Sequence, residues 1–390
     1  MQEAGSLLVK LLEKQKVDRV FCVPGESYLS VMNGLQETSI ETILCKHEGA
    51  ASMMAEADGK LTGRPGIAFV TRGPGATNAA SGIHIAQQDS TPMILFVGQI
   101  GKEMYGRDAF QEVDYQQFYG GMAKLVIEVQ QSDRLSEIFS RAYHTAMSGR
   151  PGPVIIALPE NMLTEKTDKK PLEFIDQLMS APTTKDLAQF IEEIKEAKNP
   201  IVVLGGSIWS HEAEKDLISI SEMLGLTIIT SHRRQSYYNN LHKNYGGDLG
   251  LGVNPKLIDR INNSDYLVLL GGRLSENPSQ GFTLLDIPEH NKKFIHIHPG
   301  SEEIGRIYKP HLGIVSNPIA FVNILNNALK GLNTKPNSEN ELNAVKSHEE
   351  YIEWGDMPLE APNSGVDLTS AFRTLRKHLD PNTIITNGAG

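Results

Sequence analysis

The sequence predicts an α/β fold with two consecutive three-layer α/β domains, each built on a mainly parallel sheet, and the start of a third domain. Short apolar runs rich in valine and isoleucine, such as residues 66–70 and 93–98, alternate with longer stretches of helical periodicity. This alternation is typical of βαβ units, whose parallel strands are buried on both faces. The same alternation starts again after residue 180 and indicates a second domain of the same class.

Residues 1–165 form the first predicted domain. It begins with an amphipathic helix that places Leu7, Leu8, Leu11 and Leu12 on one face. Strands are then expected at VDRVFC, TILCKHE, GIAFV, TPMILFVGQ and PVIIALP, with helices at residues 49–62, 76–89 and 135–148. The loops after these strands, PGES, KHEG, TRGPGATN and GQIG, lie where open α/β sheets bind their ligands.

A polar, lysine-rich stretch at residues 164–170 is predicted to link the first domain to the second domain, residues 181–330. Strands of the second domain are expected at NPIVVLGGS, LTIITSH, DYLVLLGGR and KKFIHIHPG. Residues 331–340 have the composition of another linker. Residues 366–390 then hold a predicted helix at 368–379 and a predicted strand, NTIITNGAG. Because a βαβ unit needs more chain than this, we expect a third domain that is truncated here.

Composition and charge narrow the class of protein. The net charge is −10 without a long basic run, so neither nucleic acid nor an anionic membrane is the expected partner. The apolar runs are far shorter than the ~20 residues that span a bilayer, and the N-terminus does not resemble a signal peptide. The only cysteines, Cys22 and Cys45, lie in strand-like runs. We therefore expect reduced thiols in a cytoplasmic protein rather than a disulfide.

Glu48 is the most unusual single residue in the sequence. It follows an apolar, strand-like run and is followed at once by four small residues, GAAS. A desolvated carboxylate is unfavourable unless it is hydrogen-bonded, so Glu48 is either a structural acid, such as an N-cap, or the acceptor for an incoming ligand. A zinc site is excluded because Ala51 stands where the second histidine of HExxH would be. No P-loop, G-x-G-x-x-G turn or G-x-S-x-G elbow is present, and no metal ligands are predicted.

Six motifs in order carry a resemblance to a known family. They are VFCVPGESY, KHEGAA, GRPGIAFVTRGPGATN, DSTPMILFVGQ, DAFQEVD and SGRPGPVIIALPE. Together they resemble the thiamine diphosphate (ThDP) enzymes of the acetolactate synthase type. The resemblance implies a pyrimidine-binding domain at residues 1–165 and a Rossmann-like central domain at 181–330. It also implies that a diphosphate-binding domain begins at residue 366 and is almost entirely missing.

The resemblance implies roles for individual residues. Glu48 would share a proton with N1′ of the cofactor's aminopyrimidine, which prepares the cofactor to attack a 2-keto acid such as pyruvate. Gln111 would face the active site, as would Lys124. Glu26 would be a proton donor, since related 2-keto acid decarboxylases carry an acid there, or else a first-turn helix acid. The implied cofactor-binding residues are Pro24, Gly25, Glu48, Thr71, Gly73, Pro74, Gly75 and Asn78. Arg72 departs from the small serine that is usual in the family.

The resemblance also implies cofactors and partners. Mg²⁺ would hold the diphosphate beyond Gly390, and a homodimer or homotetramer is expected because one subunit's pyrimidine domain faces its partner's diphosphate domain. FAD is not expected, because GGRLSENPSQGF and HIHPGSEEIGR depart from the flavin-binding pattern. The 390-residue chain alone is expected to be inactive. Two alternatives stay open: another ThDP enzyme, such as a 2-keto acid decarboxylase or a benzaldehyde lyase-like enzyme, and a non-catalytic nucleotide-binding module.

Overall fold

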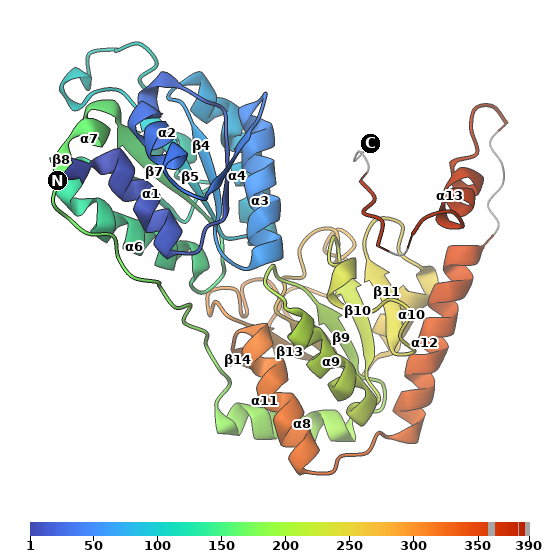
Figure 1. The fold of residues 1–390 in the computed structure, drawn as a ribbon. Coiled ribbons are helices and arrows are strands. Elements are labelled where there is room, and N and C mark those ends of the chain that lie inside the picture. Colours follow the sequence, from blue (N-terminus) through green and yellow to red (C-terminus); the bar gives the residue numbers. More distant parts are fainter. Residues whose placement is uncertain (358–362, 381, 387–390) are drawn as a thin grey trace.

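The computed structural model describes residues 1–357, 363–380 and 382–386. Figure 1 shows two α/β domains joined by an extended segment between β8 (Lys166–Thr167) and α8 (Thr184–Glu196). Two parallel six-stranded sheets with flanking helices confirm the predicted fold class for these two domains. Within the described part of the chain, no helix is both long and apolar enough to cross a membrane.

The first sheet has the strand order β3-β2-β4-β5-β7-β6, and every pairing in it is parallel. Its strands are β2 (Arg19–Cys22), β3 (Glu41–Leu44), β4 (Gly66–Val70), β5 (Met93–Gln99), β6 (Leu125–Glu128) and β7 (Pro153–Pro159). The short strand β1 (Gln2–Glu3) pairs with β8 in an antiparallel ladder beside this sheet. The five strands predicted for this domain therefore exist, whereas β6 of the sheet and the short strands β1 and β8 were not predicted.

Helices cover both faces of the first sheet, which makes three layers. The apolar core on one face includes residues from α1 (Ala4–Lys14), α2 (Leu29–Gln36), α6 (Leu135–Met147) and α7 (Glu160–Thr164). The core on the other face includes residues from α3 (Glu48–Thr62), α4 (Pro74–Asp89) and α5 (Tyr115–Tyr119). The four leucines predicted to share one face of the first helix are all fully buried. The period of 3.6 residues brings them to the same side of α1.

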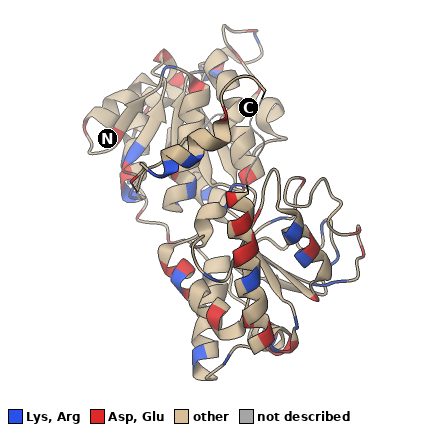
Figure 2. Ribbon diagram, turned by 90° about the vertical axis from the view of Figure 1, so that its right-hand side faces the viewer, with Lys and Arg blue, Asp and Glu red and all other residues tan. Residues whose placement is uncertain are grey.

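The second sheet is also parallel, with the order β11-β10-β9-β12-β13-β14. Its strands are β9 (Ile201–Leu204), β10 (Thr227–Ser231), β11 (Tyr245–Leu249), β12 (Tyr266–Leu270), β13 (Lys293–His298) and β14 (Leu312–Val315). The helices that follow α8 in this domain are α9 (His211–Leu224), α10 (Pro255–Asn263), α11 (Pro318–Gly331) and α12 (Ser338–Asp356). Figure 2 shows acidic and basic residues interspersed along the helices.

Helix α12 carries the second domain past the boundary predicted at residue 330. It packs on β11, where a Cβ added to Gly246 would lie 2.6 Å from the Ser347 hydroxyl. Ala344 and Ser347 are buried in that contact. β11 was not among the predicted strands, and the two glycines of its sequence YGGDL allow a helix to approach this edge strand closely.

The last described residues bear on the predicted third domain. Helix α13 (Leu368–Arg376) lies within the range predicted to be helical. The predicted final strand is wrong for residues 382–386, which carry no strand in the structure. The rest of that predicted strand, residues 387–390, lies outside the described residues.

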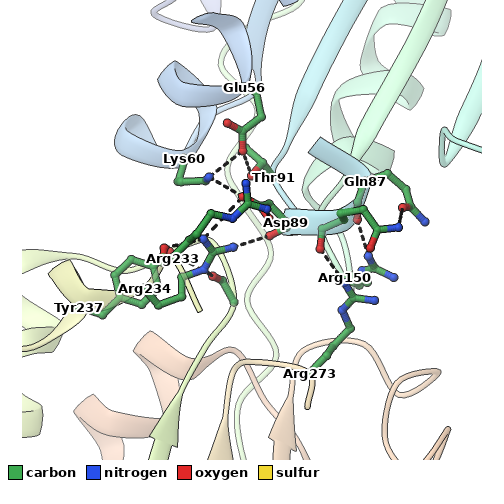
Figure 3. Close-up of polar contacts among 12 residues, drawn as sticks. Glu56, Lys60, Gln87, Asp89, Thr91, Arg150, Arg233, Arg234, Tyr237 and Arg273 are labelled. Carbon is green, nitrogen blue, oxygen red and sulfur yellow. Dashed lines mark hydrogen bonds and ion pairs between the residues drawn. The ribbon is translucent and has the colours of Figure 1, made fainter. Parts of the chain in front are cut away.

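Buried charges join the two domains (Figure 3). Asp89, the last residue of α4, pairs with Lys60 of its own domain at 2.7 Å and with Arg233 of the second domain at 2.5 Å. Burial by itself raises the pKa of Asp89, but the charges of Arg234, Lys60 and Arg233 outweigh burial and hold that pKa below its ordinary value. Nearby, Arg150 of the first domain pairs with Glu303 of the second at 3.0 Å.

We expect Asp89→Asn to lower the free energy of unfolding by about 3 kcal/mol at pH 7, since it removes the buried carboxylate that Lys60, Arg233 and the nearly buried Arg234 share. The folded-state pKa of Asp89 is depressed, so its contribution is present above the unfolded value and is lost as pH falls through the folded value. Urea denaturation of both proteins should therefore show a difference that shrinks below about pH 4. Asp176→Asn, an exposed position in the linker, is the control. A difference that persists unchanged into acid would contradict the ion-pair account.

Candidate functional site

The candidate site lies at the carboxyl edge of the first sheet. Because β2, β3, β4 and β5 run parallel and are neighbours, the loops that follow them meet at one edge. The structure thus brings together the predicted site residues of the loops after β2, β3 and β4. The loop after β5 carries Gln111 to the same place.

Glu48 is the first residue of α3 and is half-buried. The N-cap is His47, whose Nδ1 accepts a hydrogen bond from the Gly49 amide at 3.0 Å, so the suggestion that Glu48 is an N-cap is wrong. An acid in the first turn is still stabilised by the helix dipole. Asn78 Nδ2 of α4 donates to Glu48 Oε2 at 3.0 Å. Glu48 is therefore fixed by its place in α3 and by the hydrogen bond from Asn78 of α4.

Two glycines let the loops beside Glu48 pack closely together. A Cβ added at Gly75 would lie 2.8 Å from Thr71 Cγ2 and 3.5 Å from Glu48 Oε1. A Cβ at Gly25 would lie 2.5 Å from the Cβ of Thr71. Side chains at these two positions would collide with Thr71, which follows β4. Without them, the backbone of Gly25 and Gly75 packs closely on Thr71 beside the Glu48 carboxylate, and we call this arrangement the glycine cradle.

The loop after β4 is fixed by buried hydrogen bonds. Gly73 has a φ of 60°, and its amide donates to the Tyr115 hydroxyl at 3.1 Å. That hydroxyl donates in turn to the Gly98 carbonyl at 3.1 Å. Burial raises the pKa of Tyr115 to about 12, so the hydroxyl stays protonated and remains a donor. Pro74 follows as the first residue of α4, a position that proline suits.

Gln111 lies against the same loop. Its φ is 67°, and a Cβ added at Gly73 would lie 2.7 Å from the Gln111 Cβ. The turn before it is held by Glu112, whose carboxylate accepts from the Gly106 amide at 2.8 Å and from the Ala109 amide at 3.0 Å. The sequence alone did not predict that Gln111 packs on Gly73, 38 positions away by their numbers in the chain.

The remaining predicted residues have different surroundings. Pro24 is exposed next to Gly25, and Glu26 is exposed and pairs with Arg72 at 3.1 Å. Lys124 precedes β6 and therefore lies at the opposite edge of the parallel sheet, where its amine donates to the Ser148 carbonyl at 2.6 Å. The structure does not bring Lys124 to the site.

Three residues of this edge were missed by the sequence reasoning. Ser27 Oγ lies 2.9 Å from Thr71 Oγ1, Tyr115 holds Gly73, and Glu160 pairs with Arg72. Ser27 stands inside the quoted motif VFCVPGESY and could have been found there. Tyr115 and Glu160 carry no signal of their own, because a core aromatic and a first-turn acid are ordinary residues.

A second hollow region lies between the domains. Two neighbouring cavities of about 380 and 360 Å³ share Ser90, Gly206 and Gly271 in their linings. The arginines that line the first cavity are Arg233, Arg234, Arg273 and Arg306. Burial, together with the charge of Arg150, lowers the pKa of Arg273 to about 10. Among the described residues no cluster of three or more His, Cys, Asp or Glu could hold a metal ion.

The matches to known protein families coincide with the two domains. Residues 2–118 match the family model described as thiamine pyrophosphate enzyme, N-terminal TPP binding domain, and residues 187–325 match that of the thiamine pyrophosphate enzyme central domain. The chain belongs to the thiamine pyrophosphate enzymes. Glu48 and the other candidate site residues, from Pro24 to Gln111, all lie within the N-terminal match of this family.

Relatives of the chain are acetolactate synthases by name. A probable acetolactate synthase large subunit of Methanococcus aeolicus is 29% identical, over 98% of this chain and 66% of the relative. The acetolactate synthase large subunit of Corynebacterium glutamicum is 28% identical, over 98% of this chain and 61% of the relative. That of Lactococcus lactis is 29% identical, over 80% of this chain and 55% of the relative. The chain thus spans less than two thirds of the length of these relatives.

The close approach of Gly25 to Thr71 predicts that a side chain at position 25 destabilises the fold. Gly25→Ala should lower the free energy of unfolding by about 1–3 kcal/mol, since its Cβ has no room and the loops must shift. Gly121→Ala, where a Cβ would meet nothing within 4 Å, is the matched control and should change stability little. Thermal or urea denaturation measures both. Equal stability of the two variants would show that the cradle tolerates a methyl group.

Proposed function

We propose that the chain is the pyrimidine-binding and central part of a ThDP-dependent enzyme. The enzyme decarboxylates a 2-keto acid such as pyruvate and joins the product to a second carbonyl compound, as an acetolactate synthase does. The observation that carries this proposal is the half-buried Glu48 at the rim of a glycine cradle, held by Asn78. The family match of residues 2–118 supports the choice of cofactor.

The residues of this chain fit the aminopyrimidine end of the cofactor. Glu48 offers a carboxylate that can share a proton with a ring nitrogen, and Asn78 orients it. Gly25, Thr71 and Gly75 pack together beside Glu48, where the ring would bind. When bound, the cofactor would supply the thiazolium carbon at which carbon–carbon bonds break and form. We expect Gln111, which packs on Gly73, to contact the substrate.

The proposal includes partners and a location. The small-molecule substrate is a 2-keto acid, and the working enzyme is a homodimer or homotetramer in the cytoplasm, without nucleic acid or membrane partners. Mg²⁺ would be held together with the diphosphate by residues that are not among these 390. We therefore propose that this chain by itself is inactive. Turnover of pyruvate by the purified chain would refute this part of the proposal.

Glu48→Gln in the full-length protein is the direct test. We expect a loss of turnover of at least ~100-fold, the usual contribution of a positioned proton-sharing group. Pyruvate consumption measures the loss, and the melting temperature should stay close to that of the wild type because glutamine keeps an acceptor for Asn78. Glu41→Gln, an exposed acid at the start of β3, serves as the control and should retain activity. Full activity of Glu48→Gln would contradict the proposed mechanism.

Product analysis separates the ThDP reactions. Acetolactate from pyruvate supports the synthase, whereas acetaldehyde alone supports a simple decarboxylase. Benzoin formed from benzaldehyde supports a benzaldehyde lyase-like carboligase. Glu26, an acid that simple decarboxylases share at this position by resemblance, is the sequence feature that favours the second reaction.

The cleft between the domains favours a second candidate function, a nucleotide-binding module without catalysis. Four arginines line a cavity of about 380 Å³ there, and arginine suits phosphate groups. A thermal-shift series of the full-length protein with ADP, FAD, NAD and ThDP tests it. Stabilisation by one nucleotide and never by ThDP would support this function and overturn the first. We expect stabilisation by ThDP with Mg²⁺ and none by FAD, because the flavin pattern is absent from the sequence motifs of this domain.

A further inference from the structure

Arg72 joins three of the loops that surround the candidate site. It follows β4, and its Nη2 donates to Glu26 Oε1 at 3.1 Å in the loop after β2. Its Nη1 donates to Glu160, the first residue of α7, which follows β7. The Arg72 side chain is only 11% exposed, whereas that of Glu26 is 71% exposed. A nearly buried cation thus reaches an acid on either side.

The geometry of the guanidinium explains why arginine can join these loops. Its fork presents two terminal nitrogens in one plane, so one side chain can bind two carboxylates in different directions. A lysine amine carries a compact charge on a flexible stem and lacks this fixed fork. The backbone also takes part, because the Arg72 amide donates to Ser27 Oγ at 3.4 Å. Ser27 is itself wedged against Gly98, where an added Cβ would lie 1.9 Å from the Ser27 hydroxyl oxygen.

The position of Arg72 is not optimal for stability alone. Its Nε is buried and has no hydrogen-bond acceptor among the described residues. Buried polar groups without partners are uncommon in native proteins, and each calls for an explanation. Unfavourable local interactions are found mainly at functional sites, where residues must be held in one arrangement. The ion pairs with Glu26 and Glu160 hold the guanidinium in place and leave its Nε without an acceptor among the described residues.

We propose that Arg72 is a positioning residue for the cofactor-binding edge, and that Glu26 is its anchor rather than a proton donor. Through the pair, Arg72 fixes the loop of Gly25 against the loop of Thr71 and Gly75, which bounds the cradle beside Glu48. Donating a proton would require Glu26 to be neutral, and a neutral carboxyl group loses the charge that pairs with Arg72. This inference rests on the proposed ThDP function.

The test uses the full-length protein and four variants: Arg72→Ser, Arg72→Lys, Glu26→Gln and the double change of Arg72→Ser with Glu26→Gln. ThDP affinity is measured by titration, and the pH profile of kcat is measured at saturating ThDP. We expect Arg72→Ser to weaken ThDP binding by about tenfold and Glu26→Gln to weaken it less. The double variant should be no weaker than Arg72→Ser alone, because both changes break one contact. Arg72→Lys should resemble Arg72→Ser, since the fork is lost. Arg141→Ser, an exposed arginine on α6, is the control.

Two results would overturn the proposal. If Glu26→Gln abolishes turnover and removes one limb of the pH profile while ThDP affinity is unchanged, Glu26 is a proton donor. If all the Arg72 variants bind ThDP as the wild type does, Arg72 does not position the edge.

A separate readout keeps this test distinct from that of the proposed function. The melting temperatures of the same variants, without cofactor, report whether Arg72 and Glu26 are coupled. If the melting-temperature losses of Arg72→Ser and Glu26→Gln simply add up in the double variant, the two residues are not coupled. The proposed anchoring of the loops is then wrong, even if the protein never binds ThDP. Absence of ThDP binding by the wild type, with coupled melting temperatures, would instead count against the proposed function and leave the Arg72–Glu26 pair intact as a structural anchor.

Discussion

The parallel direction of the strands in the first sheet is the constraint on which the candidate site depends. Because β2, β3, β4 and β5 all end at one edge, the loops between residues 23 and 111 lie close together. Residues that are far apart in sequence, such as Glu48 and Asn78, or Gly73 and Gln111, then meet as hydrogen-bond or packing partners. The small residues between them let these loops approach one another closely.

Helix α4 connects this edge to the rest of the molecule. It begins at Pro74, beside the cradle, and ends at Asp89, which is buried among cations from both domains. The same 16-residue helix thus carries Gly75 and Asn78 at one end and the domain contact at the other. A rigid helix between two such contacts ties the orientation of the second domain to the position of the site loops.

Much of this arrangement could be predicted from the sequence, because buried parallel strands and amphipathic helices have clear periodic patterns. The leucine face of α1 and the helix that begins near Glu48 follow directly from that periodicity. Strand β11 was not predicted because glycines are more typical of loops than of strands. Here its glycines allow α12 to pack closely on the strand. The roles of Glu160 and Tyr115 could not be predicted, since they depend on which loops meet in space. Lys124 was misplaced because β6, the strand that it directly precedes, was not predicted, so its end of the sheet was unknown.

The central claim is that the glycine cradle beside Glu48 receives the aminopyrimidine of ThDP. A crystal structure of the full-length protein with ThDP and Mg²⁺ tests this claim most directly. The account predicts that a Glu48 carboxylate oxygen lies within about 3 Å of a nitrogen of the pyrimidine ring, with the ring between Gly25 and Gly75. A pyrimidine ring bound elsewhere, with Glu48 still paired only with Asn78, would contradict it.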